Sequence, residues 1–170
     1  MELDLLHYEA RWTVKHIRAG RVIWSIEDKK NLLTNEGQRA ILETFFRDRA
    51  SNYFGMTNFW LGMYRGTLSK TSVLSTVPNE PSTNGYVREE IERDSVGFPT
   101  IELNDSDRRI ISKEVEFTAV GGDVGPVNGA FLCTSSDNTG VLVGSLSFGI
   151  ERTIKAGDLM TAKMKIKVKS

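Results

Sequence analysis

The 170-residue sequence carries 22 basic and 22 acidic side chains, so its formal net charge is zero. Bulk charge therefore gives no argument for nucleic-acid binding, and any basic surface must be local. No apolar run approaches the ~20 residues that a membrane-spanning helix needs. Residues 1–6 are acidic and lack the positively charged leader of a signal peptide. The single cysteine, Cys133, lies in an apolar run, so we expect a buried, inert thiol in a protein that folds in a reducing cytosol.

The N-terminal segment has the pattern of a β-hairpin. Apolar residues alternate with polar ones along its first part: Tyr8, Ala10, Trp12 and Val14. This period of two predicts a half-buried strand. Ala19-Gly20 is a turn signal, and the apolar residues at 22–26 predict the return strand.

One helix is expected next, at residues 36–49. Asn35 is the expected N-cap, and Gln38 stands three residues later, as in a capping box. Apolar residues recur at spacings of three and four: Ile41, Leu42, Phe45 and Phe46. This spacing predicts a single apolar stripe along the helix.

A buried strand is predicted at residues 58–64, followed by a long loop at residues 65–85. The loop is rich in Ser, Thr and Asn and contains Pro78 and Pro81. Loops longer than ~15 residues are unusual inside a compact domain, so we take these prolines as candidate partner contacts. Residues 86–93 predict a charged strand, with a short helix as the alternative.

The second half of the chain predicts short strands separated by turns. Residues 104–107 have turn chemistry, strands are expected at 115–119 and 129–134, and residues 135–140 predict a hairpin loop. The next strand has one apolar face: Leu142, Gly144, Leu146, Phe148 and Ile150. These short strands predict a mainly β fold. We expect a single domain over residues 1–170, an antiparallel β-sandwich whose helix closes one end or one face.

The last stretch of the chain has the clearest pattern. Every second residue from Met160 onward is apolar, and four lysines stand between them: Lys163, Lys165, Lys167 and Lys169. A strand with this period has one dry face and one cationic face. Three explanations remain open: an edge strand protected from aggregation by charge, internal pairing with Glu114 and Glu116, or contact with an acidic partner.

No metal site is indicated by the sequence. His7 and His16 are the only histidines, and their odd spacing on one predicted strand places them on opposite faces. They therefore cannot bind one metal together from that strand. Asp105 and Asp107 lack the glycine and the distal Glu of a calcium loop, so a solvated turn is favoured.

Motifs for catalysis and ligand binding are equally weak. Residues 121–125 lack the ending of a phosphate loop, and Ser145 is not in a nucleophile elbow. Three carboxylates are flanked by arginines and predict a solvated face: Glu89, Glu90 and Glu92. Three aromatic residues offer a sugar-stacking platform or, as we favour, core packing: Phe59, Trp60 and Tyr64.

The order of several segments carries a family resemblance: Trp12-Thr13-Val14, Val22-Ile23-Trp24, Phe59-Trp60-Leu61-Gly62-Met63-Tyr64, Gly97-Phe98-Pro99, Ala130-Phe131-Leu132-Cys133-Thr134-Ser135-Ser136 and Ile154-Lys155-Ala156-Gly157-Asp158. In this order the chain resembles small structural proteins encoded among the head and tail genes of tailed bacteriophages. The resemblance extends from residue 8 to residue 168 and includes no catalytic motif. It implies a β-sandwich virion component that is assembled in the host cytoplasm.

We therefore expect a non-enzymatic virion protein, a decoration or appendage attached to the capsid or the head–tail neck. A carbohydrate-binding adhesion module of a tail or head fibre is the alternative. The expected sandwich type is jelly-roll or immunoglobulin-like. We expect other virion proteins and further copies of the chain as partners, with no cofactor, nucleic acid or membrane. The candidate contacts are the four lysines with Pro78 and Pro81.

Overall fold

A computed structural model describes residues 7–46, 58–104 and 107–169 of the chain. Several sequence expectations lie outside these residues. They are the signal-peptide comparison for residues 1–6, the end of the helix at residues 47–49, and the turn residues Asp105 and Ser106.

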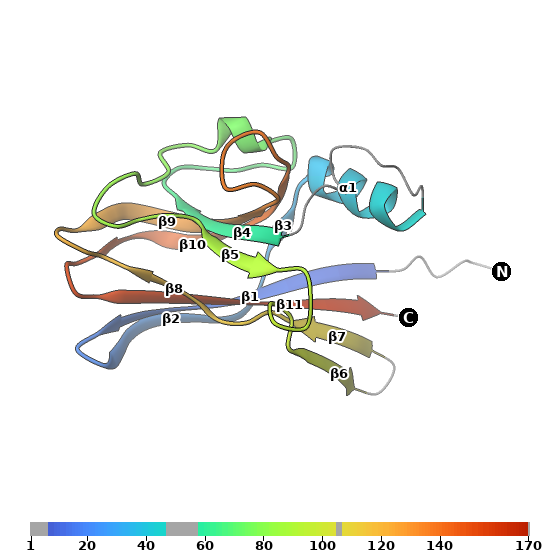
Figure 1. Ribbon diagram of the computed structural model, residues 1–170, viewed down its shortest axis with the longest axis horizontal. Coiled ribbons are helices and arrows are strands. Elements are labelled where there is room, and N and C mark those ends of the chain that lie inside the picture. Colours follow the sequence, from blue (N-terminus) through green and yellow to red (C-terminus); the bar gives the residue numbers. More distant parts are fainter. Residues whose placement is uncertain (1–6, 47–57, 105–106, 170) are drawn as a thin grey trace.

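The described residues form two antiparallel sheets and one helix, so the prediction of a mainly β fold is confirmed (Figure 1). Sheet A has six strands: β1 (His7–Arg18), β2 (Arg21–Lys30), β6 (Thr100–Asn104), β7 (Asp107–Ile111), β8 (Val115–Thr118) and β11 (Leu159–Lys169). Their order is β2-β1-β11-β7-β6, and β8 also pairs with β11.

Sheet B has five strands in the order β3-β10-β9-β4-β5. They are β3 (Leu32–Leu33), β4 (Asn58–Tyr64), β5 (Glu89–Glu92), β9 (Val124–Cys133) and β10 (Leu142–Ile154). The helix α1 (Asn35–Phe46) follows β3, and a short 3-10 helix, η1 (Leu74–Thr76), lies between β4 and β5.

The main core lies between the two sheets. Buried residues from both sheets form one cluster, for example Trp12 and Met164 of sheet A with Leu61 and Leu146 of sheet B. These side chains alternate with outward ones, as the period of two predicts. A smaller cluster on sheet B contains Tyr64, Leu74, Phe131, Cys133 and Leu142.

The N-terminal hairpin is confirmed. Strands β1 and β2 pair from Arg18↔Arg21 down to Arg11↔Lys30. Ala19 and Gly20 form the turn with φ values of 49° and 73°. Two successive residues with positive φ match the right-handed twist of the flanking strands, which explains the tight two-residue connection.

The helix is present, but its cap and its packed face differ from the prediction. The backbone N–H of Gly37 donates to Thr34 Oγ1 at 3.0 Å, so Thr34 is the N-cap and Asn35 is already helical. Leu42 is 57% exposed, whereas Ala40 and Glu43 are buried. A Cβ at Gly37 would lie 2.1 Å from the carbonyl oxygen of Val143, so glycine permits the helix to approach β10.

The predicted apolar face of β10 is interrupted after Phe148. Ile150 is 48% exposed, although the even-numbered positions before it are buried. Gly149 has a φ of +79°, and the register with β9 shifts between Ser147 and Arg152. This irregularity turns Ile150 outward, because one extra residue in a strand reverses the facing of those that follow.

Other strands agree with the sequence to varying degrees. The strand at residues 58–64 is confirmed, and the charged segment forms β5 rather than a helix, over Glu89–Glu92 only. The hairpin of β6 and β7 was not predicted. Its strands pair from Thr100↔Ile111 to Asn104↔Asp107, directly around the expected turn.

Candidate functional site

The lysine-bearing strand β11 lies in the interior of sheet A. It pairs with β1 along one side and with β7 and β8 along the other. The edge-strand explanation is therefore wrong, since both edges of β11 are occupied by neighbouring strands. The hydrophobic period that predicted a strand contains no information about which strands would pair with it.

The two faces of β11 differ as predicted. Met160, Ala162 and Met164 are buried in the core, whereas Lys163 is exposed and Lys165 and Lys167 are half-buried. The side chain of Lys169 lies outside the described part of the structure. Since cross-strand neighbours share a face, the register Arg11↔Lys165 places an arginine of β1 beside the lysines.

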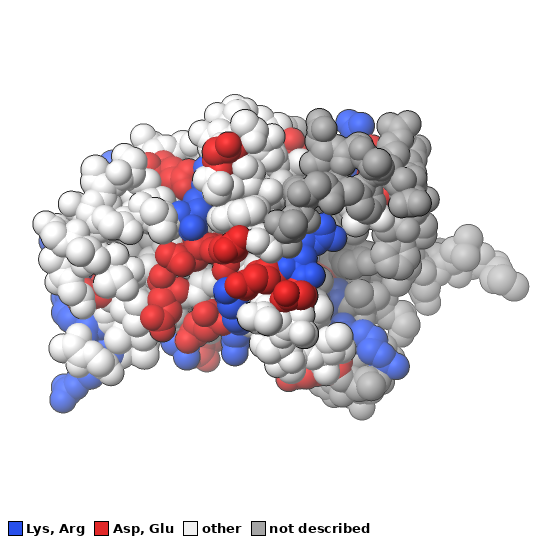
Figure 2. Space-filling view, viewed as in Figure 1, with Lys and Arg blue, Asp and Glu red and all other residues white. Residues whose placement is uncertain are grey.

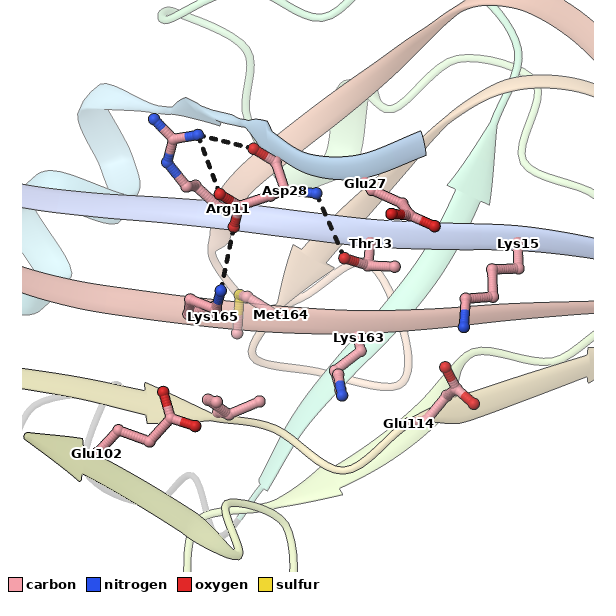
Figure 3. Close-up of a pocket in the computed structure, with 11 residues that line it drawn as sticks. Arg11, Thr13, Lys15, Glu27, Asp28, Glu102, Glu114, Lys163, Met164 and Lys165 are labelled. Atoms are coloured by element: carbon pink, nitrogen blue, oxygen red, sulfur yellow. Dashed lines mark hydrogen bonds and ion pairs between the residues drawn. The ribbon is translucent and has the colours of Figure 1, made fainter. Parts of the chain in front are cut away.

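We call this outer surface of sheet A the lysine face and define it by its cations: Arg11, Lys15, Lys163, Lys165 and Lys167. A shallow groove of about 330 Å³ runs over it (Figure 3). Four of the cations line the groove together with four carboxylates: Glu27, Asp28, Glu102 and Glu114. The surface is therefore a row of cations between two rows of acids.

One side of the lysine face is paired internally. Lys165 Nζ lies 3.2 Å from Asp28 Oδ1, and Arg11 Nη1 lies 3.3 Å from Asp28 Oδ2. Partial burial raises the pKa of Asp28, but the hydrogen bond and charge of Lys165 outweigh it and leave the pKa below its ordinary value. Asp28 is 48% exposed, so each of these ion pairs contributes ~0–1 kcal/mol to stability.

Three cations of the lysine face are not paired. Lys15, Lys163 and Lys167 make no hydrogen bond or ion pair with any residue that the structure describes. Among the described residues, the partner of a β11 lysine is thus Asp28 on β2. Glu114 and Glu116, the internal partners considered from the sequence, form no ion pair with a described lysine, and Glu116 pairs in backbone register with Thr161.

The carboxylates near β8 form a surface of their own. Figure 2 shows Asp and Glu side chains gathered in the middle of the view, where Figure 1 places β5 and β8. We define this acidic patch as Glu89, Glu90, Glu92, Glu114 and Glu116. Its local cation, Lys113, bonds Glu92 at 2.6 Å.

Glu89 lies close to other charged groups of the acidic patch. Burial raises the pKa of Glu89, the charge of Lys113 opposes this, and the charge of Glu116 adds a smaller increase. Glu116 itself is exposed. The patch is therefore a surface with excess negative charge.

The loop containing Pro78 and Pro81 does not join the lysine face. Leu74 of this loop is buried in the smaller cluster, together with Phe131 and Cys133 of sheet B. Both prolines are half-buried, and the carbonyl of Pro78 accepts a hydrogen bond from the N–H of Arg65 at 3.3 Å. Lys163, Lys165 and Lys167 thus lie on sheet A, whereas the prolines lie in the loop between β4 and β5 of sheet B, so these candidate contacts form no single site.

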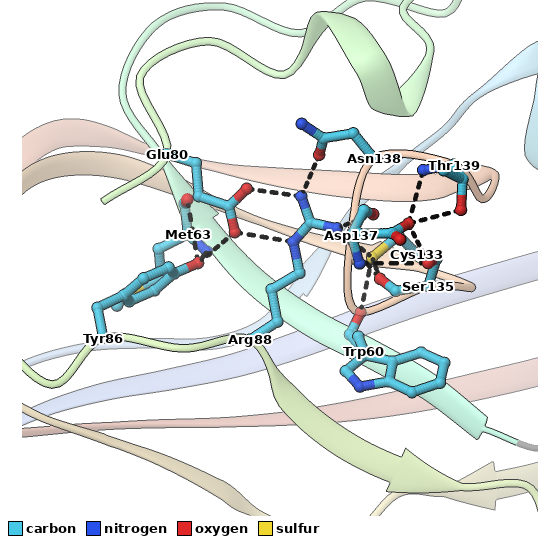
Figure 4. Close-up of polar contacts among 10 residues, drawn as sticks. All are labelled: Trp60, Met63, Glu80, Tyr86, Arg88, Cys133, Ser135, Asp137, Asn138 and Thr139. Atoms are coloured by element: carbon cyan, nitrogen blue, oxygen red, sulfur yellow. Dashed lines mark hydrogen bonds and ion pairs between the residues drawn. The ribbon is translucent and has the colours of Figure 1, made fainter. Parts of the chain in front are cut away.

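A buried arginine that no sequence motif singled out holds this loop in place (Figure 4). The side chain of Arg88 is 6% exposed and donates to both carboxylate oxygens of Glu80, at 2.8 and 2.6 Å. It also donates to the carbonyl of Ser135 at 3.1 Å and to Asn138 Oδ1 at 2.6 Å. One guanidinium therefore connects the 65–85 loop to the β9–β10 hairpin loop.

Two titratable groups beside Arg88 are held in their neutral forms. Burial raises the pKa of Cys133 to about 11, and Cys133 is a free, buried thiol, as predicted. Burial also raises the pKa of Tyr86, whose hydroxyl accepts a hydrogen bond from the N–H of Met63 at 2.8 Å and lies 2.9 Å from Glu80 Oε1. Neither group is prepared for nucleophilic chemistry, because the reactive form of each is the anion.

The other candidate residues lie apart from one another. His16 is buried and contacts Asp158, while the side chain of His7 lies outside the described residues. Ser145 is buried on β10. Within residues 7–46, 58–104 and 107–169, no group of three or more His, Cys, Asp or Glu side chains is arranged to hold a metal ion.

The three aromatic residues of β4 do not share a surface. Phe59 packs against the main core, with its ring 6.1 Å from that of Phe98. Trp60 packs against the smaller cluster, and Tyr64 is 2% exposed within it. Core packing is thus confirmed for Tyr64, and these rings offer no common platform for a sugar.

Comparison with known proteins gives no identification. No protein-family model matches the chain, and no curated protein sequence matches it significantly. Among the described residues, no helix combines the length and the apolar character that crossing a membrane requires.

Proposed function

We propose that the chain is a structural component of a tailed-phage virion, a decoration or appendage on the capsid or the head–tail neck. In this proposal the two sheets form one β-sandwich domain of the jelly-roll or immunoglobulin-like type. The protein is assembled in the host cytoplasm and acts by binding neighbouring subunits. The order of segments along the sequence supports the proposal, and the lysine face supplies a surface for such binding.

The observation that carries the proposal is the rigid presentation of a row of cations, two of which, Lys163 and Lys167, have no ion pair among the described residues. Lys163, Lys165 and Lys167 stand on a strand that is hydrogen-bonded on both sides, so their backbone positions are fixed. Alternate residues on a strand are ~7 Å apart, which sets a regular spacing of charge. Such a surface suits a neighbour with carboxylates in a matching row.

The chemistry of the described residues supports a binding role over a catalytic one. The buried His16 has Asp158 beside it, but no hydroxyl or thiol forms a hydrogen bond with either ring nitrogen. Cys133 and Tyr86 are held neutral on the other sheet. A hydrolase needs a nucleophile, a base and an orienting group within hydrogen-bond reach of one another.

The test is to locate the protein in purified particles. Particles of the phage that encodes the chain are separated into heads and tails, and each fraction is examined by mass spectrometry. We expect the protein in the head or neck fraction. A protein that stays in the lysate and is absent from every particle fraction would overturn the proposal.

A paired variant tests the lysine face in the same experiment. Lys163→Glu with Lys167→Glu reverses two unpaired cations, and we expect incorporation into particles to fall by about tenfold or more. The matched control is Lys70→Glu, an exposed lysine in the 65–85 loop, which should be incorporated normally. Both variants should keep the melting temperature of the wild type. Normal incorporation of the double variant would exclude the lysine face as the contact.

A further inference from the structure

Two surfaces of opposite charge meet at one border of sheet A. Strand β8 pairs with β11 in the register Thr161↔Glu116, so Glu116 lies beside the start of the lysine stripe. Glu114 lines the groove together with Lys163 (Figure 3). The acidic patch and the lysine face are therefore neighbours on the same molecule.

Both surfaces carry charge that is not neutralised within the described part of the chain. On one side, Lys15, Lys163 and Lys167 have no ion pair there. On the other side, Lys113 is occupied by Glu92, and Glu116 is exposed with no described ion pair. Each surface thus has unpaired groups that the other could bind.

Two adjacent surface patches of opposite charge allow two copies of a molecule to pair symmetrically. A twofold axis through their border exchanges them, so that each patch of one molecule lies on the opposite patch of a second molecule. Such an interface is isologous and closes at two copies. The whole chain has a formal net charge of zero, so no long-range repulsion opposes its self-association.

We propose that the lysine face binds the acidic patch of a second copy of this chain around such a twofold axis. Lys163 of each copy approaches Glu116 of the other, and each pair occurs twice. This contact rests on the proposed structural role for its setting in a particle. It adds to that role by naming a second copy of the chain as the neighbouring subunit.

The experiment measures the mass of the isolated protein by sedimentation equilibrium over a range of concentrations. The variants are Lys163→Glu, Glu116→Lys, and the two substitutions combined in one chain. We expect the wild type to dimerise, and each single variant to have a dissociation constant raised about tenfold or more, since one substitution alters two contacts. The combined variant restores opposite charges and should recover most of the affinity.

Mixing the two single variants gives a second, independent readout. A Lys163→Glu chain and a Glu116→Lys chain complement each other at both contacts, so an equimolar mixture should form a heterodimer although each variant alone dimerises about tenfold or more weakly than the wild type. Lys70→Glu is the matched control and should dimerise like the wild type. A melting temperature close to that of the wild type shows that each variant is folded.

Several outcomes would overturn the inference. They are a wild type that is monomeric at every concentration, single variants that dimerise normally, or a combined variant that is as weak as the singles. Open-ended growth beyond two copies would overturn the twofold arrangement. A monomeric wild type would contradict the dimer but not the virion role. Absence of the chain from purified particles would contradict the virion role but not the dimer.

Discussion

At the scale of single residues, Asp158 is a buried carboxylate that accepts several hydrogen bonds. It is 3% exposed and receives hydrogen bonds from Arg18 at 2.9 and 2.8 Å and from the N–H of Lys155 at 3.2 Å. His16 Nε2 lies 2.8 Å from the same carboxylate. The hydrogen bonds from Arg18 lower the pKa of Asp158 despite its burial, and His16 adds to the effect. Asp158 thereby joins the end of β1 to the β10–β11 turn.

Replacing this carboxylate with an amide should destabilise the protein in a pH-dependent way. We expect Asp158→Asn to lower the free energy of unfolding by about 2 kcal/mol near neutral pH, because charge-assisted hydrogen bonds are lost. The folded pKa is lowered, so this contribution is present above the unfolded pKa of about 4 and is lost as the pH falls below it. Urea denaturation at about pH 7 and pH 3 measures the effect.

The variant should therefore differ from the wild type at neutral pH and approach it in acid. The opposite trend, with a difference that grows as the pH falls, would contradict the assigned direction of the pKa. Asp123→Asn is a suitable control, since Asp123 lies on the neighbouring loop and its carboxylate bonds Lys155 in a largely exposed pair.

At the scale of elements, the 65–85 loop is held by contacts that unite three segments. Glu80, Arg88 and the β9–β10 hairpin loop meet at one guanidinium, and Leu74 fills the smaller cluster from above sheet B. This explains how a long segment without strands is accommodated in a compact structure. A partly buried ion pair and the packing of Leu68, Leu74 and Val77 against the smaller cluster both contribute to its order.

Removing the guanidinium should release this loop. We expect Arg88→Ala to cost about 3 kcal/mol, because the carboxylate of Glu80 and the backbone carbonyls of Ser135 and Asp137 lose their partner in a partly buried setting. Hydrogen exchange should increase across residues 65–85 and 135–140 more than elsewhere. Arg65→Ala is the matched control: its pair with Glu151 is half exposed on both sides, so the cost should stay below ~1 kcal/mol. Equal effects of the two substitutions would contradict this role for Arg88.

At the scale of the whole molecule, stability depends on the shared core between the sheets. Trp12 is completely buried there, between residues of both sheets. Its Nε1 is buried and has no hydrogen-bond partner among the described residues. The indole therefore contributes through packing, while its N–H is a cost.

The two contributions of Trp12 can be separated by substitution. We expect Trp12→Ala to lower the free energy of unfolding by about 4 kcal/mol, because it leaves a large cavity. Trp12→Phe should cost only about 1 kcal/mol, since most of the packing remains and the unpaired N–H is removed. Chemical denaturation measures both. A phenylalanine variant as unstable as the alanine variant would show that the N–H is bonded in the folded protein.

Local sequence patterns determined most of the elements. The alternation at Tyr8–Val14 and Met160–Val168, the Ala19-Gly20 turn and the apolar run at 58–64 each specify a conformation within a few residues. They could be read directly, because side-chain period and turn chemistry are properties of neighbouring residues. The helix cap was misplaced by one position, since Thr34 and Asn35 both cap well and only the backbone distinguishes them.

Only the tertiary structure decided what these elements bury and expose. The same lysine pattern fits an edge strand or a central one, and pairing with β1, β7 and β8, up to 162 positions away, placed β11 inside the sheet. The partnership of Glu80 and Arg88 with the 135–140 loop, and that of Lys165 with Asp28, likewise joins residues separated along the chain. Such contacts depend on the path of the folded backbone, which no local period encodes. The sequence alone therefore determined that lysines would share one face, and the fold determined which of them remain unpaired.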